Sequence, residues 1–208
     1  DGEVASRIAA ETISNYLLQM LIMPMLKDGK ATSDKIISEL DEAIQLANRC
    51  IAEQAKMAQN DMGTTATLAF VVNDMAYIAN VGDSRTYLWN KQGLHQITED
   101  HSAVYQLVKK GALRPDEIYT HPQRSEILRS LGIGRQVQVD QFQVQLLPEN
   151  LLLLCCDGLW EMIRNEGIED ILLQGFINPQ LICDELIRRA NQAGGEDNIS
   201  VLVVRAVA

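Results

Sequence analysis

The spacing of apolar residues along the chain predicts helices near its start. Over residues 4–25 and again over 33–60, apolar residues recur at the period of one helix face. Thr32 and Ser33 suit the N-cap of the second helix, and Pro24 with the stretch from Lys27 to Lys30 is expected to end the first. We therefore expect two amphipathic helices that pack on a flat surface.

The middle of the chain changes to the patterns of strands. TTATLAFVV and MAYIANV flank Asn73-Asp74, and RTYLW and LHQIT flank a polar turn, which is the pattern of two hairpins. LLLLCC is short and wholly apolar, as expected of a strand buried on both faces. The expected strands are 64–72, 75–81, 85–89, 94–98, 136–147, 151–156 and 199–204, and two further helices are expected at 160–173 and 178–194.

Residues 97–134 interrupt this order. Ser102 suits the cap of a short helix that Gly111 ends, and the rest is rich in proline and glycine. We expect an excursion from the sheet that is more loop than core.

Two helices, a block of antiparallel strands and two more helices indicate the α+β class. The expected architecture is two stacked antiparallel β-sheets sandwiched between pairs of α-helices. The chain has 208 residues, of which 47% are hydrophobic, and this is enough for one well-packed domain over 1–208.

Charge and cysteine content narrow the expected partners. The 28 acidic and 18 basic residues give a net charge of -10, which argues against nucleic acid or an anionic membrane as a partner. The four cysteines have no paired metal spacing, so we expect reduced core residues of a cytoplasmic protein and no zinc site. No stretch is long enough to span a membrane, and the start does not have the pattern of a signal peptide.

Two carboxylates stand where strands end and begin. Asp157 follows the buried strand 151–156, and Asp197 precedes the strand 199–204. If these strands are antiparallel neighbours, the two acids lie at the same end of the sheet and repel each other unless a cation lies between them. The sequence therefore predicts a shared cation site.

Other polar residues have simpler interpretations. Asp83, in a Gly-Asp-Ser link, is interpreted as a structural turn residue, and Asp100 as an acid at a helix N-terminus. The three histidines share no face or ligand spacing, so we expect no metal site from them.

Six segments occur in the order and approximate spacing of a known family. They are MGTTATLAF, ANVGDSR, ITEDHS, HPQRSEILRSLG, LLLLCCDGLW and GGEDNISVLVV. Over nearly its whole length the chain resembles the metal-dependent type 2C serine/threonine protein phosphatases, in their short bacterial form.

The resemblance implies a function. Members hydrolyse phosphoserine and phosphothreonine with a water held between two Mg²⁺ or Mn²⁺ ions, and oxygen ligands suit such hard cations. By motif, Asp157 and Asp197 would ligate one core metal, and Asp100 would match the acid that helps bind a weaker third ion. Asn198 would position Asp197, and about 102–125 would be the flap beside the active site. The implied partners are phosphorylated proteins, including a serine/threonine kinase or its substrates, with a role in signalling.

The chain also departs from the family pattern. It enters that pattern at GEVAS, after the loop whose Asp bridges both metals, and we find no counterpart of that Asp, of the phosphate-binding arginine or of the proposed acid histidine. We therefore expect weak metal binding and little or no hydrolysis from the chain as given.

Three interpretations remain open. The chain is an active phosphatase whose first segment is not included, a catalytically silent relative that keeps the scaffold to bind a partner, or an unrelated acidic binding module. The survival of three acids at metal positions favours the first.

A basic set in the flap region is the last candidate. Lys109, Lys110, Arg114 and Arg124 are expected to tune which phosphorylated segment is accepted. The alternative is a solvated loop with incidental charge.

Overall fold

The computed structural model describes residues 1–174 and 178–207. Its contacts divide the chain into two compact units, and each is described by itself. Unit 1 comprises Asp1–Ala66, Ala79–Gly82 and Ile127–Gln141, and unit 2 comprises Thr67–Ile78, Asp83–Glu126 and Phe142–Ala208.

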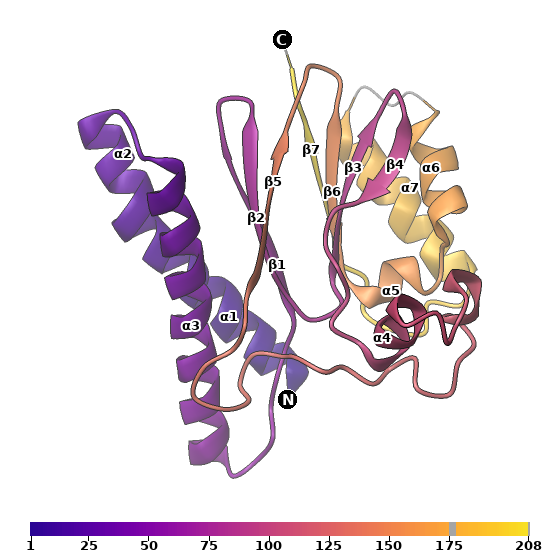
Figure 1. Ribbon diagram of the computed structural model, residues 1–208, viewed down its shortest axis with the longest axis horizontal. Coiled ribbons are helices and arrows are strands. Elements are labelled where there is room, and N and C mark those ends of the chain that lie inside the picture. The colour runs from indigo at the N-terminus through magenta and orange to yellow at the C-terminus, as the bar shows by residue number, and fades with distance from the viewer. Residues whose placement is uncertain (175–177, 208) are drawn as a thin grey trace. The chain divides into compact units, whose positions relative to one another are not determined.

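Unit 1 is built on two long helical segments that pack against each other, as Figure 1 shows for α1 and α3. The second predicted helix is confirmed, with the Thr32 side chain accepting a hydrogen bond from the Lys35 amide at 3.3 Å. Its predicted apolar face is buried, including Ile36, Leu40 and Ile51. The helical elements are α1 (Gly2–Leu17), the π-helix η1 (Leu18–Ile22), α2 (Met23–Asp28) and α3 (Ser33–Ala58).

Pro24 does not by itself end the first helix, and the end falls in the expected stretch from Lys27 to Lys30. The helix continues to Asp28 and ends at Gly29, whose φ of 81° is left-handed. The π-helix just before Pro24 explains this: the Met23 amide already bonds to the Leu18 carbonyl, five residues back. Because the bonding pattern is shifted there, Pro24 falls in the first turn of α2, where no amide hydrogen is needed.

The strands form two sheets. The two predicted hairpins are both present, and each lies in a different sheet. The predicted strand 136–147 is shorter than expected. One sheet has the order β1 (Ala66–Val72), β2 (Met75–Val81), β5 (Asp140–Gln145); the other has the order β4 (Gly93–Gln96), β3 (Arg85–Asn90), β6 (Leu151–Cys155), β7 (Val201–Arg205).

Strand β6 is the centre of unit 2, and all of its residues are buried. Its alternate side chains serve two layers. Leu152 and Leu154 pack with Ile78 and other residues of β1, β2 and β5. Leu151, Leu153 and Cys155 pack with residues of α6 (Asn165–Leu172) and α7 (Pro179–Gln192), which lie beside this sheet in Figure 1. The α+β class with stacked antiparallel sheets is therefore confirmed.

One predicted helix is divided. In place of 160–173 there are two helices, α5 (Asp157–Trp160) and α6, because Arg164 is extended and starts α6 as a new helix. The predicted short helix after Ser102 is confirmed as α4 (Ala103–Lys109), and Pro115–Glu117 forms the 3-10 helix η2. Among the described residues, no helix is both long and apolar enough to cross a membrane.

Candidate functional site

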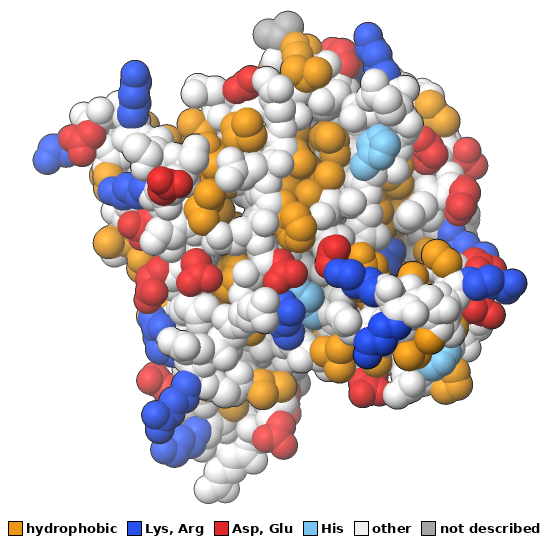
Figure 2. Space-filling view, viewed as in Figure 1, with side chains coloured by type: hydrophobic (Ala, Val, Ile, Leu, Met, Phe, Trp, Pro, Cys, Tyr) orange, Lys and Arg blue, Asp and Glu red, His pale blue; other side chains and the backbone are white. Residues whose placement is uncertain are grey.

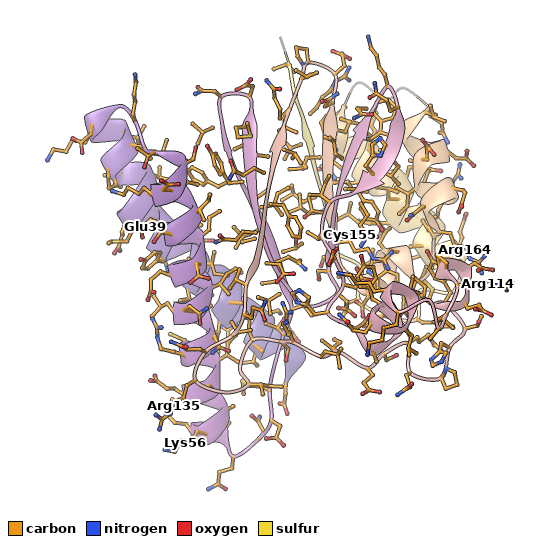
Figure 3. All side chains as sticks on the ribbon, viewed as in Figure 1. Glu39, Lys56, Arg114, Arg135, Cys155 and Arg164 are labelled. Atoms are coloured by element: carbon orange, nitrogen blue, oxygen red, sulfur yellow. The ribbon has the colours of Figure 1, made fainter. Side chains whose placement is uncertain are left out.

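The predicted adjacency of the two acid-bearing strands is confirmed. Strands β6 and β7 pair antiparallel, with Cys155 opposite Val201. Asp157 follows Cys155 and Asp197 precedes Val201, so both acids lie at the same end of the four-stranded sheet. Figure 3 labels Cys155 at this end of β6.

Each acid is oriented by the amide that follows it. The Gly158 amide donates to Asp157 Oδ1 at 2.9 Å, and the Asn198 amide donates to Asp197 Oδ1 at 2.6 Å. Burial raises the pKa of Asp157, and the nearby charge of Asp197 raises it further. The two carboxylates therefore share one electrostatic environment.

The donor chemistry of this pair fits a hard divalent cation. Carboxylate oxygens are the ligands that Mg²⁺ and Mn²⁺ prefer, and a cation between the two acids would relieve their repulsion. Within residues 1–174 and 178–207, no group of three or more His, Cys, Asp or Glu side chains is arranged to hold a metal ion.

Two further acids belong to this environment: Asp83, which was interpreted from the sequence as a structural turn residue, and Glu161, which was not singled out. Burial raises the pKa of Asp83 to about 7, with added repulsion from Asp157 and Asp100. Burial also raises the pKa of Glu161, again with repulsion from Asp157. Glu161 could have been recognised from the sequence as a neighbour of Asp157, because it lies one helical turn after it. For Asp83 the signal is the pairing of β3 with β6, which local patterns do not reveal.

Asp100 is tightly bound to a buried arginine. Its side chain is 2% exposed, as is Arg85. Arg85 Nε donates to both carboxylate oxygens at 3.0 and 3.1 Å, and one terminal nitrogen of Arg85 lies 2.6 Å from Oδ2. Gln96 Nε2 adds a bond to Oδ1 at 2.9 Å. Asp100 is therefore a counter-ion of Arg85 in this structure, and its role as a third-metal ligand stays a prediction.

The Arg85 guanidinium also connects Asp100 to the helix that begins at Asp157. Its central carbon lies 3.6 Å from the centroid of the Trp160 ring, in the geometry of a cation–π contact. Trp160 Nε1 donates to the Asp83 carbonyl at 3.0 Å. Strand β3, α5 and the Asp100 loop are thus fixed to one another beside the acids.

The four predicted flap cations are not equivalent. Lys109 pairs with Glu99 at 2.6 Å, and the exposed Arg114 lies within 3.5 Å of Asp116 and Glu117. Lys110 is exposed at the end of α4. Figure 2 shows basic and acidic side chains interleaved around this segment, at the lower right of the view. The flap segment therefore does not present a dense set of basic side chains.

Arg124 forms ion pairs with acids of the site. Its guanidinium lies 3.8 Å from a Glu161 oxygen and 3.8 Å from a Glu196 oxygen. Glu196 directly precedes Asp197, and Glu161 lies near Asp157. Near its C-terminal end, the predicted flap thus contacts both sides of the acid pair.

Among the described residues, the histidines belong to no group that could hold a metal ion. His101 is 4% exposed. His121 Nδ1 accepts a hydrogen bond from the Gln123 amide at 3.2 Å. None of these contacts is a catalytic arrangement.

Comparison with known proteins agrees with the geometry. The family model of protein phosphatase 2C matches residues 2–106, and that of stage II sporulation protein E matches residues 111–207. The serine/threonine phosphatase stp of Listeria monocytogenes serotype 4b (strain F2365) is 36% identical over 203 residues, which are 98% of this chain and 78% of that protein.

Solved structures give the same result. A bacterial serine phosphatase has a TM-score of 0.87 and 31% identity, covering 99% of this chain and 80% of that one. The catalytic domain of the serine/threonine protein phosphatase PstP, in complex with two manganese ions, has a TM-score of 0.83 and 29% identity, covering 99% and 82%. With a family model over half of its length and a relative matched along 78% of that relative's own sequence, this chain belongs to the protein phosphatase 2C family.

Proposed function

We propose that this chain is a metal-dependent protein phosphatase that hydrolyses phosphoserine and phosphothreonine, with Asp157 and Asp197 as metal ligands. The observation that carries the proposal is the position of these two acids at one end of β6 and β7, where the charge of Asp197 helps to raise the pKa of Asp157. The relatives named serine/threonine phosphatases support the reaction class.

The residues of the chain have separable roles in this proposal. A bound Mn²⁺ or Mg²⁺ lowers the pKa of a coordinated water and offsets charge on phosphoryl oxygens. Asp157 and Asp197 present oxygens held by the Gly158 and Asn198 amides. Glu161 and Asp83 add negative charge that favours a cation there. Arg124 is the nearest flap cation for an incoming phosphorylated segment.

The proposal extends to the cellular location and the partners of the protein. We propose that the protein acts in the cytoplasm, in signalling, on phosphorylated proteins that include a serine/threonine kinase or its substrates. The free state of all four cysteines is consistent with a reducing compartment. The pairing of Asp100 with Arg85 does not exclude a third ion, and we keep Asp100 as a proposed ligand for it.

A phosphothreonine peptide tests the function. Phosphate release is measured with Mn²⁺ and with a chelator, for this chain and for a form extended at its N-terminus to the length of its relatives. We expect Mn²⁺-dependent release from the extended form, and we expect Asp197→Asn to abolish it. Metal-bound but inactive protein in both forms would instead support the silent, partner-binding interpretation.

A further inference from the structure

The segment that carries Asp197 has no regular structure of its own. Residues 196–200 lie between the end of α7 and the start of β7, outside any helix or strand. Backbone hydrogen bonds of a helix or a sheet therefore do not fix the Asp197 carboxylate relative to Asp157. Contacts with another element must do so.

Those contacts come from Cys156, the residue before Asp157. The Ser200 amide donates to Cys156 Sγ at 3.1 Å, and the thiol lies 3.1 Å from the Asn198 carbonyl oxygen, to which it donates. The Cys156 amide also donates to the Ser200 carbonyl at 3.2 Å. One residue at the end of β6 thus bonds to the backbone on the C-terminal side of Asp197 at three places.

Gly158, on the other side of Asp157, meets the same backbone. A Cβ atom at this position would lie 2.2 Å from the Asn198 carbonyl oxygen and 3.0 Å from the Asn198 carbonyl carbon. Asn198 therefore lies directly against the turn that carries Asp157. The residues before and after Asp157 both contact the residue that follows Asp197.

We infer that the Cys156 thiol is a positioning residue, which fastens the segment carrying Asp197 to the end of β6 and so sets the relation of the two carboxylates. The effect of this positioning on catalysis rests on the proposed function. A side chain at this position must both donate and accept, and a thiol does so, as a hydroxyl would. Alanine and valine can do neither.

Amide hydrogen exchange of Ser200, measured without metal, tests the fastening directly. We expect faster exchange in Cys156→Ala and in Cys156→Val, which keeps the side chain's bulk, and a return to the slower rate in Cys156→Ser. Cys183→Ala is the matched control, because Cys183 is also a partly buried free thiol, lies on α7 and bonds to the backbone of Val203 rather than to residues 196–200. It should leave Ser200 unchanged.

Mn²⁺ affinity, measured by calorimetry on the same variants, tests the consequence. Loss of a residue that orients a metal ligand typically weakens affinity about 10- to 100-fold, and we expect that range for Cys156→Ala and Cys156→Val. Cys156→Ser should bind as the unmodified chain does, and so should Cys183→Ala.

Three results separate the possibilities. Unchanged Ser200 exchange and unchanged affinity in both Cys156→Ala and Cys156→Val would overturn the inference, as would a Cys156→Ser variant as impaired as Cys156→Ala. In a third result, the unmodified chain does not bind Mn²⁺, but the Ser200 amide still exchanges faster in Cys156→Ala and Cys156→Val. The proposed function would then be wrong, and the positioning role of Cys156 would hold.

Discussion

Arg85 shows how one buried charge organises the residues around the candidate site. It is 2% exposed, makes a two-pronged contact with Asp100 and lies against the Trp160 ring. One of its terminal nitrogens also donates to the Tyr87 hydroxyl at 3.1 Å. The planar fork of guanidinium is needed for this set of bonds, and an ammonium group would not reproduce it.

We predict that Arg85→Ala destabilises the fold strongly. Removing one partner of a buried ion pair leaves an uncompensated charge, which costs about 3–5 kcal/mol in free energy of unfolding. Urea denaturation would measure the change. Arg188→Ala is the control, since Arg188 pairs with Glu185 at the surface and should matter little. Equal effects of the two substitutions would contradict a central role for Arg85.

Asp83 gives a prediction for pH. Its pKa in the folded chain is about 7, against an ordinary value of 3.8. Between these values the folded chain binds a proton that the unfolded chain has released, so metal-free stability should fall as pH rises from about 4 to 7. Asp157 and Glu161 have raised pKa values and contribute with the same sign.

In Asp83→Asn the fall in stability over this pH range should therefore be shallower, and stability at pH 8 should exceed that of the unmodified chain. Denaturation in chelator-containing buffer from pH 4 to 8 measures both quantities. Asp61→Asn, at an exposed position, should keep the original slope. Parallel curves for the unmodified chain and Asp83→Asn would refute the assignment.

Among the elements, the flap is the one for which the sequence prediction and the structure differ most. Four basic residues looked equivalent in sequence, but Lys109 and Arg114 have acidic partners within the flap region itself. The ion pairs of Arg124, by contrast, extend to Glu161 and Glu196 beside the site. Local sequence patterns cannot reveal such pairings, because they depend on how the loop returns to the sheet.

We predict that Arg124→Ala, in an N-terminally extended form, lowers kcat/KM for phosphopeptides several-fold more than for p-nitrophenyl phosphate, because the small ester does not extend to the flap. Lys110→Ala is a control that removes the same charge from an exposed flap position without a described pairing to the site. Equal proportional losses for both substrates in Arg124→Ala would show that the flap does not determine specificity.

Helix boundaries show where sequence patterns succeed and fail. The cap at Thr32 and the ends at Gly29 and Gly111 are local features, and such features can be recognised in a sequence. The passage of the first helix through Pro24 depends on a π-helix, whose bonding gives no periodic signal. The division between α5 and α6 likewise depends on how Ile163 and Ile168 enter the core of unit 2.

Across the whole molecule, the sequence allowed the fold class and the Asp157–Asp197 pair to be predicted. The buried run of β6 and the apolar β7 each carry an acid at a strand end, so their antiparallel pairing was enough. Asp83 could be placed beside these acids only once the pairing of β3 with β6 was known, and this pairing joins residues distant in the chain. Long-range pairing is what local periodicity does not encode.

The central claim is that Asp157 and Asp197 hold one divalent cation together. Calorimetric titration with Mn²⁺ tests it most directly, using the unmodified chain, Asp157→Asn, Asp197→Asn and, as a control, the exposed Asp184→Asn on α7. We predict measurable binding by the unmodified chain and the control, and its loss in each of the two site variants. Binding by Asp157→Asn and Asp197→Asn equal to that of the unmodified chain would contradict the account.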